Sequence, residues 1–165
     1  MNKEDNDTLC RVGKGTPMGE LLRRYWLPAA LSADLPEPDG DPIRVRLVGQ
    51  DFVAFRDSDG RVGILDEHCP HRRASLVLGR VGHGGIECLY HGWRFSVEGR
   101  ILQMPNCDDE KVQARYRATA YPAREAGGLV WVYLGPPDAQ PEFPLHPWME
   151  ASEAHRYTRI IASNA

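Results

Sequence analysis

The sequence predicts a mainly β protein with one helix near its N-terminus. From Ile43 onward, apolar residues alternate with polar ones, which is the period of a half-buried strand. Short apolar runs follow one another, and turn signals such as the Asp57-Ser58-Asp59-Gly60 segment separate them. A chain of 165 residues can build one real core but hardly a second full domain. We therefore expect one main β domain.

A helix is expected from Thr16 to about Leu27. Thr16 can cap it, and Pro17 suits the first helical position because its missing N–H would be unpaired there anyway. An apolar stripe at helical spacing should pack on the protein, and Pro28 should end the helix. The stripe consists of Leu21, Leu22, Tyr25 and Trp26.

The segments around this helix are expected to be irregular. Residues 1–15 look like a loose lead-in, and residues 34–42 are a connector in which prolines prevent regular pairing. Residues 1–42 are thus expected to form a lead-in, a helix and a connector.

Residues 43–134 are expected to form the main β domain. The region 105–113 is polar and is expected to be a surface loop. Strands are expected at residues 43–47, 52–56, 62–65, 85–88, 94–97, 101–104, 117–122 and 129–134.

The character of the sequence changes at Gly135. The run GPPDAQPEFPLHPW holds five prolines, which indicates an extended boundary segment. One more strand is expected at residues 155–161, and the sequence then stops without a turn or cap. We therefore expect residues 135–165 to lead into a further domain of a longer chain.

Composition excludes several classes of function. The net charge of -3 leaves no basic stripe for nucleic acid. No apolar run approaches the roughly 20 residues of a membrane span, and the polar N-terminus MNKEDNDTLC is not a signal peptide. Cys10 and Cys107 are expected to be free thiols in a reducing cytoplasm.

The most informative feature is a pair of short loops at residues 69–71 and 88–93. Each offers one cysteine and one histidine, in the order Cys69, His71, Cys88 and His91. In a Rieske centre one iron takes two Cys thiolates and the other takes two His nitrogens. Two loops that each carry both ligand types would supply that split.

The same residues also allow two other site chemistries. Zinc remains open, although zinc fingers usually place both cysteines before both histidines. A thiolate nucleophile is less favoured, because no orienting group for Cys88 and His91 is evident and the other pair would be idle. His71 and His91 are expected to face solvent or a partner, and His68 is expected to be an exposed non-ligand.

The residues around the loops fit an iron–sulfur site. Pro70 should stiffen the first loop, and Tyr90 and Trp93 should exclude water from the second. Glycines are expected to let backbone N–H groups approach bridging sulfides; they are Gly79, Gly82, Gly84, Gly85 and Gly92. His83, His146 and His155 have no ligand partner in sequence and are assigned no role.

The pattern Cys69-x-His71…Cys88-x-x-His91-Gly92-Trp93 resembles the Rieske [2Fe–2S] signature. The segment GKGTPMGELLRRYWLPA at 13–29, residues 45–70 and HGWRF also resemble the N-terminal part of phthalate-dioxygenase-like Rieske oxygenases. This likeness covers nearly the whole chain from about residue 10. It implies a Rieske fold of small antiparallel sheets with a cluster-binding subdomain, ligated by the four Cys and His residues.

The resemblance also implies an enzyme of which this chain is one part. Family members continue into a catalytic domain with a mononuclear Fe(II) on two histidines and a carboxylate, and residues 1–165 do not supply those ligands. The parent enzyme would hydroxylate or demethylate an aromatic acid in the cytoplasm. A flavin/iron–sulfur reductase using NAD(P)H would deliver electrons, and neighbouring α subunits would form a trimer.

Two departures separate this chain from respiratory Rieske proteins. Those proteins carry an extra cysteine in each loop, whereas Leu89 and Tyr90 precede His91 here and no cysteine follows His71. Trp93 stands where the respiratory type has a hydroxyl donor to sulfur. Fewer donors predict a potential in the lower part of the Rieske range, about -150 mV. A stand-alone Rieske ferredoxin remains the alternative function, and a zinc-stabilised interaction module is a third.

Overall fold

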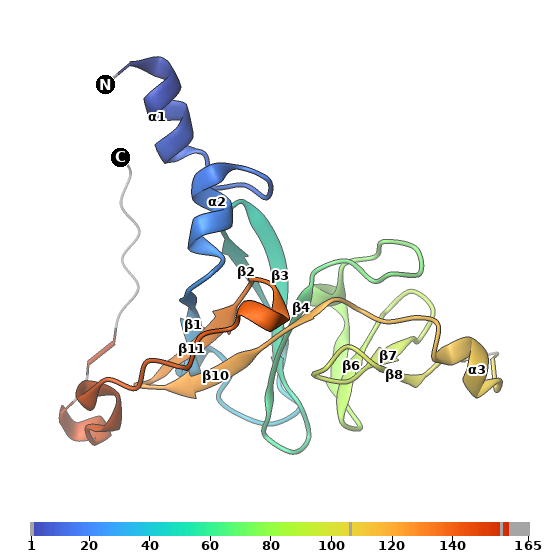
Figure 1. The fold of residues 1–165 in the computed structure, drawn as a ribbon. Coiled ribbons are helices and arrows are strands. Elements are labelled where there is room, and N and C mark those ends of the chain that lie inside the picture. Colours follow the sequence, from blue (N-terminus) through green and yellow to red (C-terminus); the bar gives the residue numbers. More distant parts are fainter. Residues whose placement is uncertain (1, 106, 156, 159–165) are drawn as a thin grey trace.

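The computed structural model describes residues 2–105, 107–155 and 157–158. Within these residues the strands form three antiparallel sheets, with orders β1-β11-β10, β2-β3-β4-β9 and β5-β6-β7-β8 (Figure 1). The mainly β prediction is confirmed. The strands are β1 Trp26–Leu31, β2 Ile43–Leu47, β3 Gln50–Arg56, β4 Val62–Asp66, β5 Arg80–Gly82, β6 Gly85–Glu87, β7 Arg94–Phe95, β8 Ile101–Gln103, β9 Ala120–Tyr121, β10 Ala123–Ala126 and β11 Leu129–Tyr133. The α-helices are α1 Lys3–Cys10, α2 Pro17–Leu22 and α3 Glu110–Gln113.

Strand β3 connects two hydrophobic clusters because successive side chains of a strand point to opposite faces. Val53 and Phe55 belong to the cluster beneath the predicted metal loops, whereas Phe52 and Ala54 belong to the cluster shared with β1 and β11. All four side chains are fully buried. The β2-β3-β4-β9 sheet therefore supports the loops on one face and the first sheet on the other.

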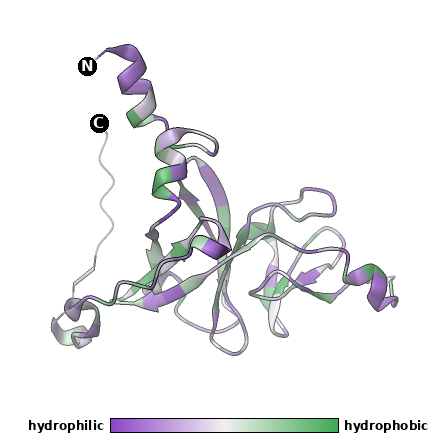
Figure 2. Ribbon diagram, viewed as in Figure 1, coloured by the Kyte–Doolittle hydropathy of each residue, from purple (hydrophilic) through white to green (hydrophobic). Residues whose placement is uncertain are grey.

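Residues 2–27 differ from the expectation in two ways: an unexpected helix lies within the predicted lead-in, and the predicted helix is shorter than expected. Residues 3–10 form α1, which is mostly hydrophilic and buries none of its residues (Figure 2). Thr16 caps α2, as predicted: its hydroxyl accepts a hydrogen bond from the N–H of Gly19. The helix ends at Leu22, however, and does not reach Leu27.

The expected apolar stripe of this helix was wrong. Leu21 and Tyr25 are 48% and 59% exposed, and Trp26 is buried as the first residue of β1. Pro28 lies inside β1, where the pairing with β11 shifts register between Pro28 and Ala30. Proline has no N–H and cannot donate a hydrogen bond to the neighbouring strand. A register shift tolerates it because one residue of the strand is left unpaired there.

The hairpins of the second sheet agree with the sequence. Strands β2 and β3 pair from Ile43 opposite Ala54 to Leu47 opposite Gln50. Val48 and Gly49 both have positive φ in the connecting turn, as a two-residue hairpin of the primed type requires. The later turn is held by Asp57, whose carboxylate accepts hydrogen bonds from two backbone N–H groups of the turn.

Two expectations need correction, and one strand was not expected. The strand β5 at Arg80–Gly82, which pairs with β6, was not among the predicted strands. The expected loop at 105–113 contains the short helix α3. The strand expected at 117–122 is divided, with β9 on the second sheet and β10 on the first.

The proline-rich segment lies against the first sheet. Trp26 donates its indole N–H to the carbonyl of Pro141 at 3.1 Å, and Phe143 packs edge-on against Trp26 at 5.2 Å between ring centroids. Phe143 also meets Trp131 at 5.8 Å. Of the strand expected at 155–161, His155 lies in a 3-10 turn, and residues 156 and 159–161 lie outside the described part. No helix in the described part is both long and apolar enough to cross a bilayer.

Candidate metal centre

The two predicted loops have the same backbone fold. The N–H of Cys69 donates to the carbonyl of Ala74 at 2.9 Å, and the N–H of Cys88 donates to the carbonyl of Trp93 at 2.8 Å. In each loop the carbonyl of the cysteine accepts the N–H four residues on, from Arg73 at 3.0 Å and from Gly92 at 2.9 Å. The structure thus pairs two equivalent hairpin-like loops.

Each loop turns through the left-handed region at the same position. Gly92 has φ of 68°, which glycine adopts without steric cost. Arg73 has φ of 61°, which is uncommon for a side chain with a Cβ. The shared turn, and not the residue type, is therefore what the two loops have in common.

The two thiols lie next to each other inside the protein. Cys69 and Cys88 are 1% and 2% exposed and belong to the hydrophobic cluster on β3. Burial raises the pKa of Cys69 to about 11, and the adjacent Cys88 thiol adds to that rise. The backbone N–H groups of His71 and Arg72 point at the Cys69 sulfur and act in the opposite direction. A bound metal would favour the thiolate outright.

The two imidazoles lie together at the surface. The rings of His71 and His91 have centroids 4.6 Å apart, and both residues are exposed, as predicted. Desolvation lowers the pKa of His71, and the nearby cationic forms of His91 and Arg72 lower it further. A lowered pKa favours the neutral imidazole, which is the form that binds metal.

The indole of Trp93 stacks on the imidazole of His71. It is 7% exposed and stacks on His71 with centroids 4.5 Å apart and planes 3° apart. Tyr116 packs edge-on against the same indole at 5.1 Å. The expected shielding of the loop is confirmed for Trp93 but wrong for Tyr90, which is 61% exposed although its ring lies 3.9 Å from that of His91.

Two glycines near the loops allow neighbouring backbone segments to pack closely. A Cβ on Gly79 would lie 2.4 Å from the carbonyl oxygen of Glu87, and one on Gly85 would lie 2.2 Å from that of Phe95. Gly84 has φ of 79° in the β5–β6 turn, and open space surrounds Gly82 and Gly84. The N–H groups of Gly79, Gly84 and Gly92 already donate to Leu76, Ser58 and Cys88, each at 2.9 Å, which argues against the expected approach of these three glycines to bridging sulfides. For Gly82 and Gly85 the expectation stays a prediction.

Sequence reasoning missed two ion pairs that flank the loops. Arg44 on β2 donates two hydrogen bonds to Glu67, at 3.1 and 2.7 Å, and the hydroxyl of Ser75 donates to the same carboxylate at 2.6 Å. These contacts join the two ends of the first loop, and the Arg44 hydrogen bond lowers the pKa of Glu67.

The second loop has a matching pair. Arg94 donates to Glu87 at 2.6 Å, directly after Trp93 and directly before Cys88. For this second pair a sequence signal was present, because opposite charges stand one residue outside the loop on either side. Such outer contacts orient the ligand-bearing backbone.

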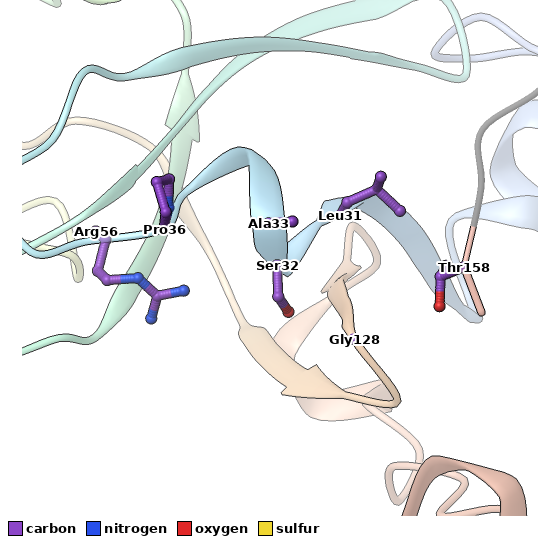
Figure 3. A pocket seen from close by; sticks show the side chains of 7 residues that line it. All are labelled: Leu31, Ser32, Ala33, Pro36, Arg56, Gly128 and Thr158. Atoms are coloured by element: carbon purple, nitrogen blue, oxygen red, sulfur yellow. The ribbon is translucent and has the colours of Figure 1, made fainter. Parts of the chain in front are cut away.

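Two histidines and one cavity lie outside the predicted ligand set. His68 and His83 are exposed. All four cysteines are free, so the loops hold no disulfide. A hollow of about 430 Å³ is lined by Leu31, Arg56 and Gly128, among others, and by no residue of the two loops (Figure 3).

The donor set fits one kind of centre. Two adjacent thiols and two adjacent imidazoles, one of each per loop, match the Cys₂/His₂ division between the two irons of a Rieske cluster. No described group of three or more metal-binding side chains surrounds a single point, whereas each Rieske iron takes only two protein ligands. The family model of the Rieske [2Fe-2S] domain matches residues 25–122. The chain belongs to this family.

Relatives of this Rieske domain are oxygenase subunits. The chain is 45% identical to the phthalate 4,5-dioxygenase oxygenase subunit of Pseudomonas putida over 166 residues, which is 100% of this chain and 37% of the relative. It is 43% identical to the 5,5'-dehydrodivanillate O-demethylase oxygenase subunit of Sphingobium sp. (strain NBRC 103272 / SYK-6), over 99% of this chain and 38% of the relative. The chain therefore spans little more than a third of these relatives.

Solved structures agree in fold. A crystal structure of dicamba monooxygenase with non-heme iron and dicamba superposes with a TM-score of 0.66 at 27% identity, over 74% of this chain and 36% of that one. The QL mutant of NdmA from Pseudomonas putida CBB5, with caffeine, superposes with a TM-score of 0.69 at 26% identity. The superposition covers 80% of this chain and 40% of the NdmA chain.

Proposed function

We propose that residues 43–134 are the electron-transfer domain of a Rieske non-heme iron oxygenase. The observation that carries the proposal is the pair of equivalent loops, each with one buried thiol and one exposed imidazole. We assign Cys69 and Cys88 to one iron and His71 and His91 to the other. When bound, a Rieske [2Fe–2S] cluster supplies reversible one-electron chemistry at a higher potential than a four-cysteine cluster.

The protein's own residues then have separable tasks. The hydrophobic cluster on β3 keeps water from the thiol side, and the backbone N–H groups of His71 and Arg72 stabilise negative charge on Cys69. The imidazole side is left open, so a partner can approach within contact of His71 and His91. A partner that exchanges electrons with a bound cluster would therefore meet the imidazole side of the site.

We further propose the place of this domain in its enzyme. It would take single electrons from a flavin/iron–sulfur reductase that uses NAD(P)H and pass them to a mononuclear Fe(II), in a trimer to the iron of a neighbouring α subunit. Residues 135–165 would lead into the domain that holds that iron. The names of the relatives support an oxygenase over the alternative of a free ferredoxin, and they support hydroxylation or O-demethylation of an aromatic acid as the reaction class.

The four free thiols support a reducing compartment, and we propose the cytoplasm. Disulfides form and persist in oxidising compartments. The potential stays predicted near the lower end of the Rieske range, about -150 mV.

The first test is the spectrum of the reduced, cluster-loaded protein. We expect an electron paramagnetic resonance signal whose average g lies below that of four-cysteine clusters, because two imidazoles replace two thiolates. His71→Ala and His91→Ala should each abolish the cluster's visible absorption. His68→Ala and His83→Ala are the matched controls, since both residues are exposed and lie outside the ligand positions.

Two outcomes would contradict the assignment. A g average typical of four-cysteine clusters would exclude histidine ligation, and full absorption in His71→Ala would exclude that residue. The choice between an oxygenase and a free carrier rests on the native reading frame, where a stop codon directly after Ala165 would favour the carrier.

A further inference from the structure

Arg23 is a buried cation without a matching anion. It follows α2 and is 5% exposed. Its Nη2 donates to the carbonyl of Val48 at 3.4 Å, and its Nε has no hydrogen-bond partner. Within the described part of the chain no carboxylate forms an ion pair with it. Because a guanidinium cannot lose its proton in a protein, a buried positive charge is left uncompensated.

A second arginine shows what a satisfied guanidinium looks like in this fold. Arg56 on β3 donates to the carbonyls of Leu35 and Gly60, each at 2.8 Å. It also makes two hydrogen bonds of 2.7 Å to the carboxylate of Glu125. Arg94 also has a buried Nε without a hydrogen-bond partner, but its Nη2 donates to Glu87 at 2.6 Å. What distinguishes Arg23 from both arginines is therefore the lack of a carboxylate partner among the described residues.

Arg23 borders a cavity of about 310 Å³ between α2, the start of β3 and the segment after β11. Lys14 and Arg24 also line it, both exposed, so three cations surround the space. The one carboxylate in the lining is that of Glu20, which already accepts the backbone N–H of Gly15 at 2.8 Å. Positive charge therefore exceeds negative charge around the cavity.

Asp66, the carboxylate bonded to two of the lining residues, already has hydrogen-bond partners. Asp66 accepts the hydroxyl of Tyr121 at 2.9 Å and the side-chain amide of Gln50 at 2.7 Å. Burial raises the pKa of Tyr121 to about 12, and the Asp66 charge contributes, so this hydroxyl keeps its proton and remains a donor. Tyr121 and Gln50 line the same cavity and lie between it and Asp66 in this hydrogen-bond network.

We propose that this cavity binds a small oxyanion, a carboxylate or phosphate group, with the buried Arg23 as its principal partner and Lys14 and Arg24 at its rim. A guanidinium presents its donors in a planar fork that suits two oxygens of one anion. The cavity lies at the lower end of the size range of small-molecule sites, which suits an ion with some water. None of its lining residues belongs to the metal centre, so the proposal does not depend on the function proposed above.

The test is isothermal titration calorimetry on the cluster-loaded chain at constant ionic strength with chloride as the background anion. Inorganic phosphate and acetate are titrated separately, which distinguishes the two oxyanion types. We expect saturable binding of at least one of them at one site per chain. Arg23→Gln should weaken it about tenfold or more, because a charge-assisted contact in a buried site is lost.

Two further variants keep the test decisive if Arg23→Gln does not fold. Lys14→Gln and Arg24→Gln change exposed side chains, and each should weaken binding about two- to threefold. Arg80→Gln is the matched control, an exposed arginine on β5 outside the cavity. Absence of saturable binding by both anions would overturn the proposal. So would binding that Lys14→Gln and Arg24→Gln leave unchanged, or that Arg80→Gln weakens equally.

Discussion

At the scale of single residues, one aromatic ring fixes the position of one proposed ligand, His71. His71 is exposed at the surface, yet its ring lies flat on the buried indole of Trp93. An exposed imidazole on a loop would otherwise sample several rotamers. The indole restricts His71 to an orientation beside His91, and Tyr116 supports the indole in turn. Trp93 is thus a positioning residue in our proposal.

Replacing Trp93 should therefore alter the spectrum of the cluster. We expect Trp93→Leu to broaden the spread of g values and to speed the loss of visible absorption on warming. Trp93→Phe, which keeps a ring against His71, should preserve most of the signal. Both variants should also lower the free energy of unfolding, the leucine variant by about 2–4 kcal/mol.

The control separates positioning from simple packing. Phe95 is fully buried in the same cluster, and its ring is 6.4 Å from that of Trp93. Phe95→Leu should destabilise the protein without changing the g values. If Trp93→Leu and Phe95→Leu leave equally unchanged spectra, the stacking has no influence on the ligand.

At the scale of the element, ion pairs connect strands that the hydrophobic pattern leaves unconnected. Arg44 on β2 reaches the end of β4 through Glu67, and Arg56 on β3 reaches β10 through Glu125. The second pair links two different sheets. Neither pairing is visible in the sequence, because the partners are far apart along the chain.

The Arg56–Glu125 pair predicts a pH dependence of stability. The hydrogen bond from Arg56 lowers the pKa of Glu125 in the folded protein. A lowered folded pKa gives stability that is present above the ordinary carboxyl pKa of about 4.3 and is lost as pH falls through the lower folded value. Glu125→Gln should thus reduce stability by about 1 kcal/mol at pH 7, with a smaller difference toward pH 4.

Chemical unfolding followed by circular dichroism across this pH range would measure the difference. Glu142→Gln is the matched control, because Glu142 is exposed and carries the same charge change. A gap between wild type and Glu125→Gln that stays constant from pH 7 to pH 4 would show that the carboxylate charge is not what links the sheets.

At the scale of the whole molecule, the metal loops and the N-terminal helices lie at separate ends. Figure 1 shows α1 and α2 projecting from the first two sheets, whereas β6, β7 and β8 extend to the other side. The exposed arginines Arg72 and Arg73 directly follow the first metal loop, and Arg72 lies close to the imidazole of His71. A partner that exchanges electrons at this edge would meet their charge first.

We therefore expect Arg72→Ala to slow electron delivery by a reductase at low ionic strength and to flatten its dependence on salt. Opposite charges steer association and are screened as salt rises. Arg11→Ala, at the C-terminal cap of α1, removes the same charge from the other end of the molecule and should leave turnover unchanged. Stopped-flow reduction of the cluster at several salt concentrations measures both variants. If the reduction rates of wild type and Arg72→Ala depend on salt concentration in the same way, Arg72 is not part of the docking surface.

The sequence by itself determined the class of fold, most strand positions and the four candidate ligands. These are local properties: period-two alternation, turn residues and the spacing of Cys69, His71, Cys88 and His91 do not depend on distant contacts. The helix was predicted too long because Trp26 is apolar at helical spacing, whereas pairing with Tyr133 across 107 positions of chain places it in a strand.

Tertiary structure alone decided what holds the site and what lies outside it. The stacking of Trp93 on His71 joins residues from two loops, and the Arg44–Glu67 pair joins two strands. The isolation of Arg23 depends on burial by segments from three parts of the chain. Contacts between distant residues and the absence of a partner leave no periodic trace in sequence, because they arise only when the sheets pack.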